Sequence, residues 1–143
     1  MLSLTCKTAI KAVIYLASKD DPSQKSSIVE IAQLIEASEH TVGKLLQQLV
    51  KDEIIVSNKG PNGGFFISPR QMKQPLINII ESIDGKEIFK QCGLGLTRCS
   101  GTHQCPIHNQ WKVVRDQFEK ICKENRIIDL CEPLNIGLTH LIG

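Results

Sequence analysis

The sequence predicts a mainly α-helical fold with one small β-hairpin: a winged helix-turn-helix domain followed by a long dimerisation helix. Two helical patterns separated by a single residue are followed directly by a short hairpin pattern, and a helical seam repeats near the C-terminus. These observations divide the chain into a winged helix-turn-helix domain (1–70), a connecting helix (71–90), a cysteine-rich loop (91–108), a dimerisation helix (109–132) and a C-terminal tail (133–143).

The N-terminal part begins with two amphipathic helices. Apolar residues recur at helical spacing over residues 4–18, and a second such pattern covers residues 28–36. Ser27 precedes the second pattern, and Glu30 stands three positions later. This spacing is typical of a capping box, in which the hydroxyl and the carboxylate each accept a hydrogen bond from a free backbone N–H.

A third helix and a hairpin complete this unit. Ser38 is a suitable N-cap for a helix that runs to about residue 51, and only Ala37 separates this helix from the one before it. Two strand-like runs follow at 54–57 and 65–68, on either side of the Gly/Pro/Asn turn at 58–64. Two helices joined by a tight turn and followed by a hairpin predict a helix-turn-helix with a wing.

The exposed face of the third helix and the tip of the hairpin carry candidate DNA-contacting residues. These are Ser38, His40, Thr41, Lys44 and Gln48 on the helix, and Lys59, Gly60 and Asn62 on the hairpin. A helix of this diameter fits the major groove, and a glycine-rich tip with a cation approaches phosphates closely. Any amphipathic surface helix also shows polar residues to water, so the hairpin that follows the helix makes the pattern specific.

Charge alone does not indicate a nucleic-acid partner. The formal net charge is +2, and the first seventy residues carry eight basic and seven acidic side chains. No apolar run is long enough to span a bilayer, and no signal-peptide pattern is present, so we expect a cytoplasmic protein without a membrane partner. In that reducing compartment, the six cysteines are expected to be ligands or free thiols rather than structural disulfides.

Three cysteines and one histidine are clustered with the spacing Cys92-x6-Cys99-x5-Cys105-x2-His108. Thiolates and imidazole are ligands for zinc, iron and iron–sulfur clusters, and the intervening glycines let a loop wrap around a bound group. Zinc stays an alternative, although structural zinc sites use tighter cysteine pairs. A second alternative is that the cysteines form a reversible disulfide. No oxyanion-stabilising turn or substrate pocket accompanies the cysteine and histidine, so we do not expect an enzyme.

A long helix is predicted after the cysteine segment. Before the cysteine segment, a short helix with an apolar period is predicted to begin after Pro75 and to end at Gly85. The apolar positions of the long helix alternate at three and four: Trp111, Val114, Phe118 and Ile121, continued by Asn125 and Ile128. Such a seam packs along another helix, which is either part of the same chain or a second copy. We expect a homodimer whose interface contains Trp111, Val114, Phe118 and Ile121.

The order of these features resembles the Rrf2 family of bacterial regulators over about residues 2–132. The carrying motifs are the wing Lys59-Gly60-Pro61-Asn62-Gly63-Gly64-Phe65, the three spaced cysteines, Trp111 and the long terminal helix. The resemblance implies a homodimer in which Cys92, Cys99 and Cys105 ligate an iron–sulfur cluster. His108 stands where IscR-like members place a histidine ligand, which implies [2Fe–2S], with [4Fe–4S] as the alternative.

Two positions depart from patterns within this family. NsrR-like members draw a carboxylate ligand from the first helix of the partner, but this chain has Lys7 there. IscR-like members carry a glutamate on the third helix where this chain has Gly43, so its preferred operator is expected to differ. The resemblance implies a redox-, nitric-oxide- or cluster-sensing regulator, of repressor type, that binds pseudo-palindromic DNA; a winged-helix regulator with zinc or a redox disulfide is the alternative.

Overall fold

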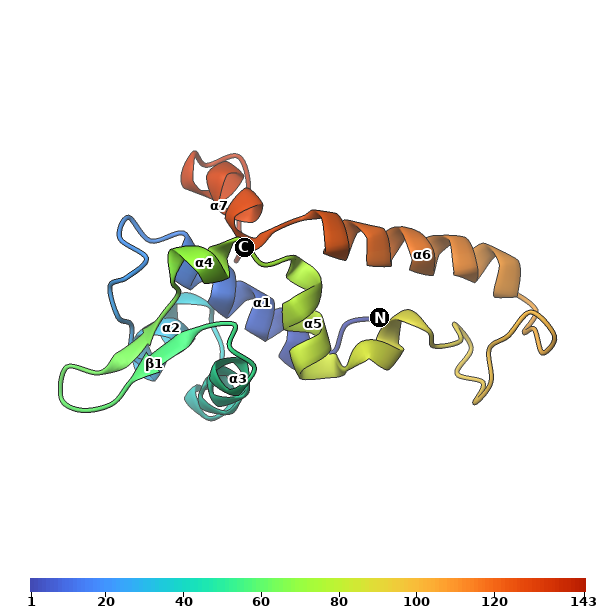
Figure 1. The fold of residues 1–143 in the computed structure, drawn as a ribbon, viewed down its shortest axis with the longest axis horizontal. Coiled ribbons are helices and arrows are strands. Elements are labelled where there is room, and N and C mark those ends of the chain that lie inside the picture. Colours follow the sequence, from blue (N-terminus) through green and yellow to red (C-terminus); the bar gives the residue numbers. More distant parts are fainter.

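The computed structural model describes residues 1–143 and consists of seven α-helices, one short 3-10 helix and one antiparallel hairpin (Figure 1). In chain order the elements are α1 (Leu4–Ala17), α2 (Ile28–Leu34), α3 (Glu39–Lys51), β1 (Val56–Asn58), β2 (Gly64–Phe66), α4 (Pro69–Met72), α5 (Leu76–Asp84), the 3-10 helix η1 (Lys86–Phe89), α6 (His108–Glu124) and α7 (Ile127–Asn135). The predicted mainly helical class with a small hairpin is confirmed. None of these helices combines the length and apolarity needed to cross a bilayer.

Serine side chains fix the start of each of the first three helices. The hydroxyl oxygens of Ser3, Ser27 and Ser38 each accept a hydrogen bond from a backbone N–H in the first turn, at 3.0, 3.1 and 3.2 Å. Each bond satisfies a donor that has no partner within the helix. The predicted caps at Ser27 and Ser38 are therefore confirmed.

The second half of the predicted capping box is wrong. The Glu30 carboxylate does not return to the Ser27 backbone. It accepts a hydrogen bond from the Tyr15 hydroxyl at 2.9 Å and lies 3.8 Å from the Lys19 ammonium. Both partners come from α1 and the residues just after it, so a tertiary contact replaced the local one. Glu30 thereby joins α2 to α1.

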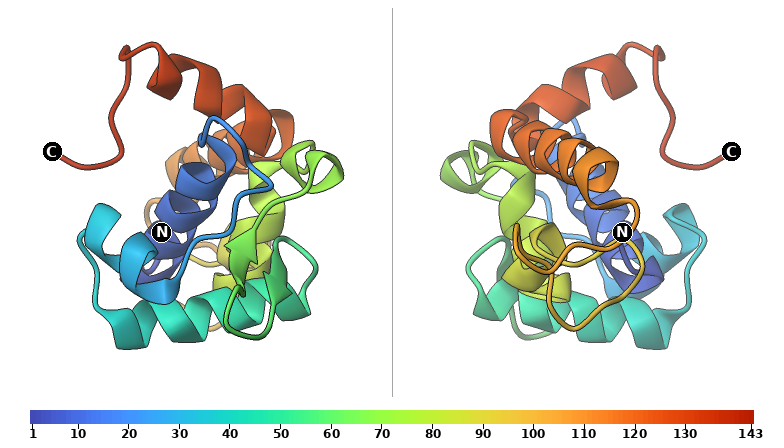
Figure 2. Two further views of the ribbon diagram at one scale, coloured as in Figure 1. Left: turned by 90° about the vertical axis from the view of Figure 1, so that its left-hand side faces the viewer. Right: turned by 90° about the vertical axis from the view of Figure 1, so that its right-hand side faces the viewer.

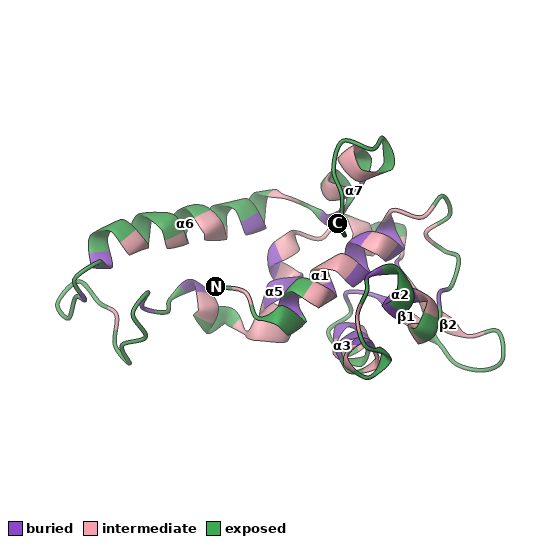
Figure 3. Cartoon of the chain, turned by 180° about the vertical axis from the view of Figure 1, so that it is seen from behind, coloured by how far each residue is buried: buried purple, intermediate pink, exposed green.

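One hydrophobic core holds the N-terminal helices together. Its 19 buried residues come mainly from α1, α2 and α3, with additions from α5, α7 and the segments beside the hairpin (Figure 3). The hairpin is shorter than predicted because Ile54, Ile55 and Ile67 turn into this core rather than pairing between strands. Each such side chain contributes about 1.5–3 kcal/mol when it is fully buried. The remaining register pairs Val56 with Phe66.

The segment after the hairpin forms one further helical turn before α5. Pro69 begins α4, a single turn in which Ser68 and Gln71 form a complete capping box. Proline suits this first helical position because its missing N–H would have no partner there. Helix α5 then ends at Gly85, whose φ of 81° is left-handed, as predicted for a helix-terminating glycine.

A second, smaller core connects this domain to α6. It consists of Cys6 from α1, Ile77 and Ile80 from α5, Phe89 from η1 and Cys122 from α6. Phe118 packs against this core, and its ring centroid lies 5.6 Å from that of Phe89. Beyond these contacts α6 extends away from the N-terminal helices, and the loop between η1 and α6 lies at its far end (Figure 1).

The predicted continuous helix through Ile128 is wrong, because the chain breaks between α6 and α7. Asn125 has extended backbone angles, with φ −94° and ψ 118°. Its carbonyl accepts the Leu76 N–H at 2.8 Å, and the Ile127 N–H donates to the Gln74 carbonyl at 2.9 Å. This short pairing with the start of α5 replaces helical hydrogen bonds. It turns α7 back onto α1, where Ile127 and Cys131 enter the main core.

Candidate functional site

Helix α3 and the hairpin tip lie on the same side of the N-terminal domain (Figure 2). His40 and Lys44 are exposed and stand one helical turn apart, so they occupy one face. The other predicted helix residues are partly engaged within the chain. Ser38 donates to the Thr41 hydroxyl at 2.8 Å, and the Gln48 carboxamide donates to Asp52 at 2.8 Å. His40 and Lys44 are therefore the freest of the five to meet a partner.

The hairpin tip is shaped by its glycines. Gly60 has a φ of 104°, which is unfavourable for other residues, and its carbonyl accepts the Gly63 N–H at 2.9 Å. A Cβ at Gly63 would lie 2.3 Å from the Asn58 carbonyl oxygen. Lys59, Gly60 and Asn62 are all exposed at this tip. The backbone is thus held in a tight turn that presents one cation outward.

The four predicted ligands gather at the N-terminal end of α6. Cys92, Cys105 and His108 are buried, and Cys99 is partly exposed. The Cys99 sulfur lies 3.3 Å from His108 Nδ1, and the thiols of Cys92 and Cys105 are hydrogen-bonded neighbours. No three His, Cys, Asp or Glu side chains in the chain are arranged to hold a metal ion. The two groups of contacts are connected, because the Cys92 thiol is also hydrogen-bonded to Cys99.

The two buried thiols of this loop have different electrostatic surroundings. Backbone N–H groups of Leu94 and Leu96 donate to the Cys92 sulfur and lower the pKa of that thiol. Burial raises the pKa of Cys105, and the neighbouring Cys92 raises it further. Cys92 therefore ionises before Cys105. Backbone N–H donors around a thiolate are also the surroundings that stabilise cysteine ligands of iron–sulfur clusters, so the donor set fits such a group.

Arg115 on α6 is a residue of this site that sequence reasoning missed. Its Nη1 donates to the carbonyls of Lys90 and Gln91 at 3.0 and 3.3 Å and lies 3.8 Å from the Cys99 sulfur. Its Nε is buried without a hydrogen-bond partner. The only sequence signal was its position one turn after Trp111, on the same face of the helix.

Trp111 holds the start of the same loop. Its indole N–H donates to the Gln91 carbonyl at 2.9 Å. Gly93 passes so close to the indole that a Cβ there would lie 2.8 Å from Trp111 Cδ2. A larger residue at Gly93 would therefore displace either the loop or the indole. Trp111 and Arg115 together tie the residues before Cys92 to the first turns of α6.

The four predicted dimerisation residues separate into two groups. Trp111 and Phe118 make contacts inside the chain, with the loop and with Phe89 respectively. Val114 and Ile121 have exposed fractions of 50% and 46% and lie two turns apart on the outer side of α6. The structure thus leaves an apolar stripe on α6 uncovered, while half of the predicted seam packs within the chain.

The other three cysteines lie in the helical cores. Cys6, Cys122 and Cys131 are buried, as expected for residues of structural packing. Burial raises the pKa of Cys6 to about 12 and the pKa values of Cys122 and Cys131 to about 11. These three thiols are consequently protonated at neutral pH and are separate from the cysteine loop.

Comparison with known proteins matches both the order of elements and the sequence. The model of the Rrf2 family, described as iron-dependent transcriptional regulators, matches residues 2–133. A protein of Aquifex aeolicus (strain VF5), described as an HTH-type transcriptional regulator, is 29% identical over 143 residues, which are 99% of this chain and 96% of that protein.

Two solved structures of regulators share the fold. CymR, the global cysteine regulator of B. subtilis, superposes with a TM-score of 0.72 and 20% identity, covering 92% of this chain and 95% of that chain. IscR of T. potens has a TM-score of 0.70 and 19% identity, covering 98% of this chain and 92% of that chain. At these identities the two structures establish the winged-helix architecture alone.

Proposed function

The chain belongs to the Rrf2 family of transcriptional regulators, and from this premise we propose that it is a cytoplasmic homodimeric regulator whose DNA affinity depends on an iron–sulfur cluster. The observation that carries the proposal is the convergence of three thiols and one imidazole at the N-terminal end of α6. The Cys99 sulfur is 3.3 Å from His108 Nδ1, and Cys92 neighbours Cys105.

The donor set favours a [2Fe–2S] cluster. Four soft ligands match a group with two iron atoms, because each iron takes two protein ligands. One histidine among three cysteines raises the reduction potential relative to four thiolates. A [4Fe–4S] cluster with the same four ligands is the alternative. When bound, the cluster supplies iron–sulfur bonds that respond to oxidation, nitric oxide or iron supply.

The DNA-binding part of the proposal rests on α3 and the hairpin. His40 and Lys44 would reach base edges in the major groove, and Ser38, Thr41 and Gln48 would support them with hydrogen bonds to bases or phosphates. The Lys59 ammonium and the backbone around Gly60 and Asn62 would contact the neighbouring phosphates or the minor groove. In a dimer with two-fold symmetry, two such surfaces fit a pseudo-palindromic site.

The second copy would cover the outer stripe of α6. Val114 and Ile121 are apolar and about half exposed, and helices of this kind bury such stripes against a partner helix. The contacts that Trp111 and Phe118 make inside the chain would hold this helix at a fixed angle to the N-terminal domain.

A contiguous set of contacts links the cysteine loop to the DNA-binding domain. Trp111 and Arg115 hold the loop to α6, Phe118 packs on Phe89, and α5 contributes to both cores. A change of ligation at Cys99 would thus alter how α6 packs against α5. A coupling of about 1–3 kcal/mol between the cluster state and DNA affinity would suffice for regulation, about five- to 150-fold.

Anaerobic purification tests the cluster directly. We expect brown protein with visible absorbance, iron and acid-labile sulfide in equal amounts, and a DNA affinity that differs between loaded and cluster-free protein. Colourless protein that takes up neither iron nor sulfide on reconstitution would contradict the cluster. Equal affinity of both forms for every promoter fragment would contradict its regulatory role.

A disulfide-switched regulator is the second candidate, favoured by the contact between the Cys92 and Cys105 thiols. Oxidation by a peroxide would form the sulfur–sulfur bond: the two thiols lose two electrons and two protons, and the peroxide is reduced to water and its alcohol, or to two waters. A loss of two hydrogens in the intact mass, with no iron bound, would favour this candidate. Stoichiometric zinc in colourless protein would instead indicate a zinc-binding regulator.

A further inference from the structure

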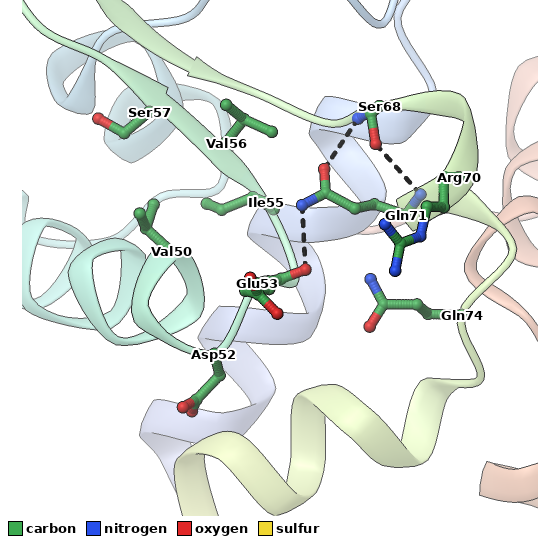
Figure 4. Close-up of a pocket in the computed structure, with 10 residues that line it drawn as sticks. All are labelled: Val50, Asp52, Glu53, Ile55, Val56, Ser57, Ser68, Arg70, Gln71 and Gln74. Atoms are coloured by element: carbon green, nitrogen blue, oxygen red, sulfur yellow. Dashed lines mark hydrogen bonds between the residues drawn. The ribbon is translucent and has the colours of Figure 1, made fainter.

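An open pocket of about 540 Å³ lies between the end of α3, strand β1 and α4 (Figure 4). Its lining residues are distant in the sequence from the cysteine loop. Its volume is within the range of sites that hold small molecules. Val50, Ile55 and Val56 supply an apolar wall, while the other lining side chains are polar or charged.

Part of the polar lining is already used to build the pocket. The Gln71 carboxamide accepts from the Ser68 N–H at 3.0 Å and donates to the Glu53 carbonyl at 3.0 Å. These bonds fix α4 against the turn between α3 and β1. Asp52 accepts from Ser82 and from Gln48, so its carboxylate is also engaged. These residues therefore form walls rather than contacts for a ligand.

Two opposite charges at the pocket have no partner among the lining residues. Figure 4 shows no hydrogen bond to the Arg70 guanidinium or to the Glu53 carboxylate, and these two groups do not form an ion pair with each other. The Gln74 carboxamide oxygen accepts from Asn78 at 3.1 Å, which leaves its amide nitrogen turned toward Arg70. Arg70 and Gln74 thus present donors on one side, and Glu53 presents an acceptor on the other.

We propose that this pocket binds the zwitterion of a free α-amino acid with an apolar side chain. The carboxylate of such a ligand accepts hydrogen bonds from the Arg70 guanidinium and the Gln74 amide, and the Glu53 carboxylate holds its ammonium group. A planar guanidinium binds a carboxylate in the two-pronged geometry that it prefers. The aliphatic side chain of the ligand lies on Val50, Ile55 and Val56.

Because of its location, a ligand in this pocket would affect the DNA-binding surface independently of the cluster. A ligand there contacts the last turn of α3 through Val50, the first hairpin strand through Val56 and α4 through Arg70. These three elements carry or support the surface assigned to DNA. The ligand therefore stabilises one arrangement of α3 and the hairpin. The binding site itself does not depend on the proposed cluster or on DNA, and it is tested without either.

Calorimetric titration of the full chain with L-leucine tests the proposal, with N-acetyl-L-leucine and L-leucine methyl ester as matched ligands. The first derivative lacks the ammonium group and the second lacks the carboxylate. We expect saturable binding of L-leucine and at least about ten-fold weaker binding of each derivative. No saturable binding of L-leucine up to roughly 10 mM, or equal binding of all three compounds, overturns the proposal.

Four variants locate the site. Arg70→Gln and Glu53→Gln are each expected to weaken L-leucine binding about ten-fold or more. Lys73→Gln is the control for Arg70: it removes an exposed cation next to α4 that does not line the pocket. Glu36→Gln is the control for Glu53: both glutamates have a left-handed backbone, with φ of 56° and 60°, but Glu36 lies after α2 and outside the pocket. Both controls should bind like the unmodified chain. Equal weakening in controls and test variants would place the ligand elsewhere and overturn the assignment.

Discussion

Arg115 joins the long helix to Cys99: its Nη1 lies 3.8 Å from the Cys99 sulfur while it also donates to the Lys90 carbonyl at 3.0 Å. The Arg115 side chain has an exposed fraction of only 13%, and its Nε has no hydrogen-bond partner. One side chain thus connects the candidate ligand, the start of the loop and α6.

Replacing Arg115 with Met should loosen the loop. The change keeps an apolar stem but removes the forked hydrogen bond from Nη1 to the Lys90 and Gln91 carbonyls, which is worth about 1.5–3 kcal/mol when the donor is charged. We expect the free energy of unfolding of cluster-free protein to fall by about 2 kcal/mol in urea denaturation. Lys112→Met, which removes an exposed ion pair with Asp116, should cost less than about 1 kcal/mol. A smaller loss in the Arg115 variant than in this control would argue against the linking role.

Ligand substitutions should separate the roles of the cysteines. Cys99→Ala is expected to abolish the visible absorbance and to preserve the helical circular dichroism, because the loop contributes no helix. Cys131→Ala, a buried change in α7, should keep the absorbance. A Cys99 variant with undiminished colour would remove that residue from the ligand set.

His108→Cys offers a test of the fourth ligand that does not depend on loss of the cluster. A thiolate in place of the imidazole should keep the colour and lower the reduction potential, since histidine ligation raises it. Optical redox titration of both proteins measures the difference. An unchanged potential would show that His108 is not bound to iron.

Lys59→Gln should weaken binding to all DNA sequences about equally. A lysine that contacts a phosphate releases about one counterion, so the salt dependence of log K should become shallower by about 0.9 per protomer. Anisotropy titrations at several salt concentrations give this slope. Lys86→Gln, an exposed change on η1, serves as the control and should leave the slope unaltered. Loss of affinity at one operator only would instead indicate base recognition by Lys59.

Charges on the outer stripe of α6 should separate the dimer. Val114→Asp combined with Ile121→Asp places two carboxylates on a surface that is about half exposed in the single chain, so the fold should survive. Sedimentation analysis is expected to show monomers, against dimers for Lys120→Asp on another face of the helix. A dimer that persists in the double variant would place the interface away from α6.

The buried thiols predict a loss of stability at alkaline pH. Burial raises the pKa of Cys6 to about 12 and those of Cys122 and Cys131 to about 11, above the ordinary value of 9.0. The unfolded chain therefore loses protons first, and the free energy of unfolding should decrease as pH rises from about 9 toward 11. Urea denaturation over this range measures the slope. Replacing Cys122 with Ala should reduce the dependence of the free energy of unfolding on pH. An identical dependence would show that the Cys122 thiol does not contribute to it.

The local features of this protein followed from its sequence. Ser27 and Ser38 cap their helices, Gly85 ends α5, and the turn at 58–64 forms a hairpin after α3. Each depends on residues within a few positions of one another, and the chemistry of those residues permits one backbone arrangement. The clustering of Cys92, Cys99, Cys105 and His108 was equally local, since these residues lie in one short stretch of the chain.

Tertiary packing decided the remaining features. Glu30 bonds to Tyr15 rather than to its own helix, and Asn125 pairs with Leu76, which ends α6 before the apolar repeat does. The contact of Arg115 with Cys99, the separation of the α6 seam into inner and outer residues, and the pocket beside α4 likewise join residues far apart in the chain. A sequence period states which face of a helix is apolar, but only the packed structure determines which surface covers that face and which polar groups find distant partners.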